Sequence, residues 1–184
     1  MCFQLKKEIT LQDQSNIIIE SYYDEFMIVH LNPKFWSIYV SKTDNIVLFN
    51  TEDRSFSTLD NSQGQQQALQ LRKALGEISI NKSNENSRIR YQISARSTNA
   101  VLRSEAIVTR EEALADTCYL SYINFSSQTS AFSVPVERSE FVVEMDVKMN
   151  IGGQRSTSHV RVTERGQFHP VPASYLDLIR KALI

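Results

Sequence analysis

Short apolar runs separated by clusters of polar residues dominate the first sixty positions of the chain. Runs that recur at intervals of about 8–12 residues are typical of antiparallel strands joined by hairpins. We expect such strands at Asn16–Tyr22, Phe26–Leu31, Phe35–Val40, Asn45–Asn50 and Arg54–Leu59. Because strands joined by short hairpins pair with their neighbours in sequence, this half of the chain should form a meander.

The most regular alternation lies near the C-terminal end of the chain. Apolar side chains take every second position there: Phe141, Val143, Met145, Val147 and Met149. The residues between them are mostly polar, which predicts a strand with one apolar and one polar face. Two glycines, Gly152 and Gly153, follow and favour a two-residue hairpin turn with positive φ. A return strand is expected over Arg155–Glu164.

Between these two regions the pattern changes several times. Ala68, Leu71 and Leu75 have helical spacing, and Gly76 is a typical helix stop, so a helix is predicted over about residues 62–76. A second helix is predicted over about residues 173–183. Further strands are expected at Arg88–Ala95, Val101–Thr109 and Thr117–Phe125, with a loop at Asn81–Ser87 and a short helical turn at Arg110–Asp116.

About ten strands and two or three helices indicate a single α+β domain over residues 1–184. A sheet of roughly ten strands must curl or split. We therefore predict a strongly curved antiparallel sheet, an incomplete β-barrel, with the helices covering its concave side.

Composition narrows the class of protein. The 184 residues carry 20 basic and 21 acidic side chains, a net charge of -1, which argues against a disordered chain and against a strongly basic nucleic-acid binder. No apolar stretch approaches the length of a membrane span. Because no signal-peptide pattern is visible, the chain as given is expected to be cytoplasmic, or located in the cell envelope if a signal sequence was removed.

Charge is unevenly distributed. Residues 82–110 carry six basic and two acidic side chains, a net of +4. Such a region is either a solvated sheet face whose charges pair across strands, or a surface that meets an acidic partner.

Catalytic signatures are scarce, and we expect a non-catalytic protein without metal or cofactor. The chain has no phosphate-binding loop, no nucleophile elbow and no histidine or cysteine spacing suited to zinc. One enzymatic alternative stays open. Removal of Met1 would expose Cys2 as an N-terminal nucleophile, although Phe3–Lys6 does not reproduce the Gly-Ile continuation of glutamine amidotransferases. Cys118 is expected to be a small buried side chain.

Several C-terminal motifs together resemble a known group. They are Phe141–Asn150, Gly152–Gln154, Val160–Glu164 and Val171–Tyr175. These segments look like the C-terminal half of the lipoprotein-carrier (LolA-like) fold, most closely an uncharacterised family of small envelope proteins. Val101–Leu114 is similar to the edge strand of that family, so the match is clearest over residues 101–175, whereas Phe35–Val40 agrees in rhythm only.

The resemblance implies a curved half-barrel whose apolar cavity holds acyl chains or other hydrophobic guests. Two sets of residues would line it from opposite halves: Phe141, Val143, Met145, Val147 and Met149, and either Trp36, Ile38 and Val40 or Phe35 and Tyr39. The chain departs from the family in lacking a visible signal sequence, and no arginine can be assigned to the inside of the barrel. The same apolar face could equally be core that the helices fill.

We therefore expect a binding module for a hydrophobic small molecule, a lipid or an apolar segment of a protein partner. The first alternative is an accessory or scaffold protein with a filled core, acting through a surface such as the basic strands 88–110. The second is a hydrolase with Cys2 as its nucleophile.

Overall fold

Eleven strands and two α-helices make up the computed structural model, which describes residues 3–85, 88–166 and Asp177. The strands of the first half are β1 (Phe3–Leu11), β2 (Asn16–Tyr23), β3 (Met27–Leu31), β4 (Phe35–Val40), β5 (Asn45–Asn50) and β6 (Phe56–Thr58). Those of the second half are β7 (Ile78–Glu85), β8 (Arg88–Arg96), β9 (Ala100–Arg110), β10 (Glu140–Ile151) and β11 (Gln154–Gly166). The helices are α1 (Asn61–Leu75), the 3-10 helix η1 (Glu112–Asp116) and α2 (Tyr119–Gln128).

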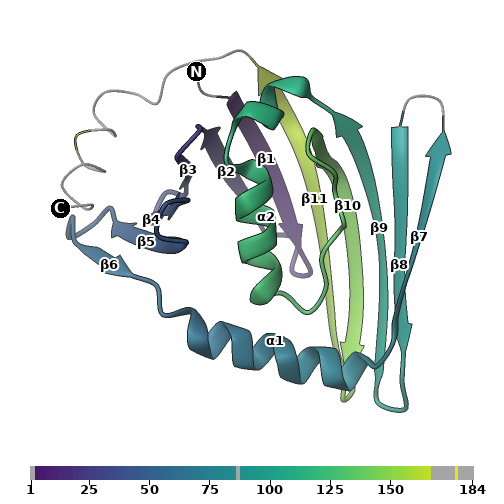
Figure 1. The fold of residues 1–184 in the computed structure, drawn as a ribbon. Helices are drawn as coiled ribbons and strands as arrows, with labels where there is room; N and C mark the ends of the chain where they lie inside the picture. The colour runs from purple at the N-terminus through teal and green to yellow at the C-terminus, as the bar shows by residue number, and fades with distance from the viewer. Residues whose placement is uncertain (1–2, 86–87, 167–176, 178–184) are drawn as a thin grey trace.

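All eleven strands belong to one antiparallel sheet in the order β6-β5-β4-β3-β2-β1-β11-β10-β9-β8-β7. Each half of the chain is a meander, and the pairing of β1 with β11 joins the two halves. The sheet is strongly curved but not closed, with β6 and β7 as its edges (Figure 1). The predicted α+β class with a large curved antiparallel sheet is confirmed.

Both helices cover the concave side of the sheet. Helix α1 links the β6 edge to the β7 edge across the open side, and α2 stands over the first strands (Figure 1). The side chain of Arg72 on α1 ties the two together by donating to the backbone carbonyls of Ser127 and Ser130, the latter at 2.7 Å. The concave side is therefore bounded by a frame of two connected helices.

Two apolar clusters occupy this concave side. The α2 cluster gathers around Tyr119 and Phe125 and contains Phe3, Leu5, Tyr23, Ile28, Tyr39, Leu114, Cys118 and Phe141, with Val143 and Val162 partly buried against it. The α1 cluster gathers around Leu75 and buries one face of β8 and β9, with Val142, Met145, Val147, Met149 and Ile151 of β10 packed against it.

Helix α1 is capped at both termini, and its C-terminal end at Gly76 is the one that the sequence predicts. The Asp60 side chain caps its start by accepting a hydrogen bond from the Ser62 backbone N–H at 2.9 Å. Gly76 ends it with φ of 72°, a conformation that glycine adopts without strain. The helix predicted over residues 62–76 is confirmed, whereas the helix predicted over residues 173–183 lies outside the described residues apart from Asp177.

Two local predictions were wrong. Thr117–Phe125 was expected to be a strand, but α2 begins at Tyr119, because packing its aromatic side chains on the concave face outweighs their strand propensity. Asn81–Ser87 was expected to be a loop, but Asn81–Glu85 pairs with β8 as part of the edge strand β7. Polar residues suit an exposed edge because they discourage pairing with other chains.

The turn between β10 and β11 generates a stability prediction. Gly152 and Gly153 have φ of 58° and 85°, as expected for this hairpin, and a Cβ at either position would meet no atom within 4 Å. Replacing Gly153 by alanine should therefore destabilise the fold through backbone strain alone, by about 1 kcal/mol in denaturant unfolding. Gly166→Ala is the matched control, since Gly166 has equal space and no positive φ. Equal stabilities for the two variants would contradict the strain argument.

Candidate functional site on the concave face

One row of aligned apolar side chains crosses the middle of the sheet on its concave face. Ala106 lies opposite Met145, and Met145 lies opposite Val160. The row continues because Val160 pairs with Ile9 and Ile9 pairs with Ile17. Ala106 is buried, but the other four side chains are only partly buried. Five strands thus present a continuous apolar row that remains in part accessible.

Neighbouring positions on the same face widen this row into a surface. Val147 and Met149 extend it along β10, Leu11 along β1 and Ile19 along β2. Leu11 is the most exposed of these, at 37%. We call this set the central apolar surface: Ile9, Leu11, Ile17, Ile19, Met145, Val147, Met149 and Val160.

The structure divides the predicted cavity residues of β10 between two clusters. Phe141 and Val143 pack in the α2 cluster, whereas Met145, Val147 and Met149 pack against the α1 cluster. The cause is a β-bulge, because the pairing with β9 shifts between Val142 and Glu144 and leaves Val143 without a partner.

The structure does not bring the predicted residues of β4 together in one place. Trp36, Ile38 and Val40 lie on the face opposite to the central apolar surface, where a separate cluster forms around Tyr22 and Val29. Tyr39, one of the alternative pair, belongs to the α2 cluster, and Phe35 is 45% exposed. Their ligand-binding roles stay predictions.

A polar cluster adjoins the central apolar surface beneath α2, and the sequence reasoning missed it. Lys7 lies next to Ile9 on the same face of β1, and its Nζ donates to the Tyr23 hydroxyl at 3.2 Å. On β3, the Nδ1 of His30 lies 2.8 Å from the Ser21 hydroxyl oxygen. The Tyr122 ring of α2 lies over His30 with 5.1 Å between ring centroids. The detectable signal was Lys7 itself, a charged residue on the apolar face of an alternating segment.

Two polar groups of this cluster lack the partners that buried or charged groups usually have. The His30 Nε2 atom is buried and has no hydrogen-bond partner. Lys7 forms no ion pair with any carboxylate among the described residues. Besides its hydrogen bond to the Tyr23 hydroxyl, Lys7 Nζ lies 5.9 Å from the centroid of the Tyr23 ring. The cluster therefore offers a buried ring nitrogen without a hydrogen-bond partner and a lysine ammonium without a carboxylate.

The surroundings keep the ring groups of the cluster neutral. Burial, together with the nearby charge of Lys7, lowers the pKa of His30 to about 3. Burial raises the pKa of the Tyr23 and Tyr122 hydroxyls. At neutral pH the positive charge of Lys7 is thus the charge that this site presents to a ligand.

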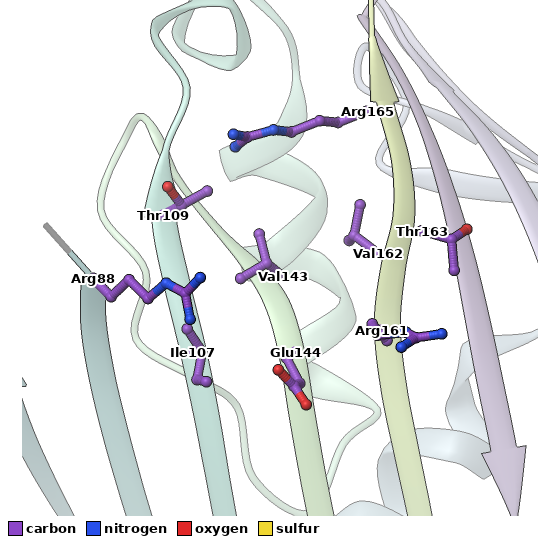
Figure 2. A pocket seen from close by; sticks show the side chains of 9 residues that line it. All are labelled: Arg88, Ile107, Thr109, Val143, Glu144, Arg161, Val162, Thr163 and Arg165. Atoms are coloured by element: carbon purple, nitrogen blue, oxygen red, sulfur yellow. The ribbon is translucent and has the colours of Figure 1, made fainter.

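A second candidate site is a pocket of about 360 Å³ in the split between β10 and β11. The pairing of these strands ends at Glu144 and Arg161, just before a register irregularity in each of them. In Figure 2, Arg88 and Arg165 extend toward the pocket from opposite sides. Neither forms an ion pair among the described residues, whereas Arg161 pairs with Glu8 at 3.3 Å.

The most deeply buried carboxylate, in contrast, is fully engaged. Glu140 is 0% exposed and accepts hydrogen bonds from the Tyr91 hydroxyl at 3.3 Å and the Glu137 backbone N–H at 3.0 Å. Lys82 and Arg110 approach it at 3.4 and 3.7 Å. We assign it a structural role, because a buried carboxylate with these partners holds the chain before β10 in place.

Other candidate chemistry receives no support from the described part of the chain. Among those residues no group of three or more His, Cys, Asp and Glu side chains could hold a metal ion, and no helix is long and apolar enough to cross a membrane. Cys118 is free and buried, as predicted, and burial raises the pKa of its thiol to about 12. Cys2, the proposed hydrolase nucleophile, lies outside the described residues.

Comparison with known proteins finds similarity to solved structures. The sequence matches no protein-family model and no curated protein. A solved structure from Vibrio parahaemolyticus, described as a “putative outer membrane lipoprotein-sorting protein domain”, resembles the chain with a TM-score of 0.43 and 7% identity. The match covers 99% of this chain and 91% of that one.

The neutral His30 generates a prediction about pH. Because its pKa is about 3 in the folded chain and about 6.5 when unfolded, only the unfolded state takes up the proton between these values. Stability should fall as the pH drops below about 6.5, with a slope of at most about 1.4 kcal/mol per pH unit from this residue. His30→Gln should remove that component in denaturant unfolding measured at several pH values.

The control for this experiment is His159→Gln. His159 is partly exposed on the opposite face beside Asp146, and its replacement should leave the His30 component in place. If the His30→Gln variant loses stability with falling pH as steeply as the parent, the neutral burial of His30 is wrong.

Proposed function

We propose that this chain is a binding module that holds a hydrophobic ligand, such as an acyl chain, against the central apolar surface. The carrying observation is the row from Ala106 through Met145, Val160 and Ile9 to Ile17, which is apolar on five strands and partly accessible on four. Helices α1 and α2 bound this surface and would restrict where a ligand can lie.

Apolar burial is sufficient as a driving force for such binding. Each buried methylene contributes about 0.8 kcal/mol, so about ten of them give roughly 8 kcal/mol before the entropic costs of association. Met145 and Met149 supply flexible, polarisable side chains that adapt to guests of different shape. We therefore expect modest affinity and broad selectivity for chain length. The resemblance of the C-terminal motifs to envelope proteins makes the cell envelope the proposed place of action.

The arginine-lined pocket favours a second candidate function. Arg88 and Arg165 form no ion pair with any carboxylate whose side chain the structure describes, and they would bind an anionic group of a protein partner. In that case the chain would be an accessory protein whose concave face is filled core.

Titration with a fluorescent fatty acid distinguishes these functions. The parent protein should bind the probe saturably, and Met145→Lys should weaken binding by at least about tenfold, because a charge would enter the apolar surface. Gln92→Lys is the matched control, since Gln92 is exposed on the other face of the sheet, and it should bind normally.

Folding of each variant is checked by circular dichroism. If Met145→Lys unfolds, Leu11→Lys tests the same surface at its exposed border, where a lysine is tolerated. Absence of saturable binding by the parent protein, or equal binding by a folded variant at either position, would contradict the proposed function and favour the accessory role.

A further inference from the structure

The polar cluster under α2 forms one end of the central apolar surface. In the register of the sheet, Lys7 lies directly between Ile19 on β2 and Val162 on β11. The next position along the same face of β1 is Ile9, which belongs to the apolar row. A ligand lying on that row would therefore meet the Lys7 ammonium at its end.

Two hydrogen bonds define the chemistry of the cluster. The Lys7 ammonium has only donors, so the Tyr23 oxygen must accept from it. The Ser21 hydroxyl oxygen lies 2.8 Å from the Nδ1 of His30. When the Ser21 hydroxyl donates to Nδ1, the imidazole proton resides on Nε2.

The position of the imidazole proton determines what the Nε2 atom of His30 can bind. Nε2–H is then a buried donor without an acceptor, and such groups cost free energy unless a ligand or water satisfies them. Lys7 retains further N–H donors that no carboxylate satisfies among the described residues. The Tyr23 ring lies near both groups, with 6.1 Å between its centroid and that of His30 and 5.9 Å between its centroid and the Lys7 Nζ, so one acceptor group could engage both.

We propose that Lys7 and His30 bind the carboxylate of an amphiphilic ligand whose hydrocarbon chain lies on the central apolar surface. This rests on the proposed function and specifies its ligand class as a long-chain carboxylic acid. One lysine charge beside neutral donors matches a monoanion, whereas a phosphate with nearly two charges is usually held by arginines or helix N-termini. The Tyr122 ring, tilted by 53° against the His30 ring, would border the carboxylate from the α2 side.

The test compares head groups on one hydrocarbon chain by displacement of a fluorescent probe. Dodecanoic acid should bind the parent protein at least about tenfold more tightly than dodecanol. Lys7→Met keeps the length of the side chain and removes its charge, and it should abolish that preference while dodecanol still binds. Lys6→Met is the matched control, because Lys6 pairs with Glu164 at 3.0 Å on the other face, and it should keep the preference.

The outcomes separate the two proposals. Equal binding of acid and alcohol by the parent protein would overturn the carboxylate site and leave the hydrophobic function standing. Binding of neither compound would overturn both. Tenfold tighter binding of dodecyl phosphate than of dodecanoic acid would overturn the assignment to a carboxylate.

A second readout does not depend on affinity. Nitrogen NMR of the histidine ring should show the His30 proton on Nε2 in the free protein, and its Nε2 resonance should shift on addition of dodecanoic acid. A proton on Nδ1, or an unchanged resonance at saturation, would contradict the role of His30.

Discussion

The pairing of β1 with β11 is the interaction on which the rest of the structure depends. The two strands lie near opposite ends of the described chain, and their register sets Ile9 against Val160 and Lys7 against Val162. Each half of the chain can pair its own strands locally, and in the described sheet the β1–β11 pairing is the strand pairing that joins the two meanders. Without it both halves would expose an unpaired edge, which invites aggregation. Pairing β1 with β11 also brings distant parts of the chain together, which has an entropic cost. The apolar pairs between the two strands must offset that cost.

The same strand explains how an apolar surface acquires a polar end. Along the concave face of β1, Leu5 is buried in the α2 cluster, Lys7 is the cation, Ile9 is part of the apolar row and Leu11 lies at the exposed border. Alternation with period 2 puts these four positions side by side. Strand β1 alone thus contains the transition from packed core to accessible surface, with the charge of Lys7 between the two.

Alternation in the sequence predicted most strands and the curved sheet, because period 2 reports which residues share a face. It could not tell which face is concave: β4 buries Ile38 on one face and Tyr39 on the other. The bulge at Val143 leaves no trace in the alternation, although it divides the predicted row of β10. Helix α2 depends on tertiary packing, since its aromatic residues favour strands locally. The sequence could not identify Lys7 as a candidate binding residue, because its neighbours on β2 and β11 follow from the strand register.

In the proposed function, a hydrophobic ligand lies on the concave face beside β10. Methionine methyl NMR tests this directly, because Met145 and Met149 belong to the central apolar surface and Met27 packs in the cluster on the opposite face. On titration with a saturated acyl chain, we predict that the methyl signals of Met145 and Met149 shift saturably and together. The chemical shift of the Met27 methyl group should not change. A ligand that shifts Met27 alone, or leaves Met145 and Met149 unchanged at saturation, would contradict it.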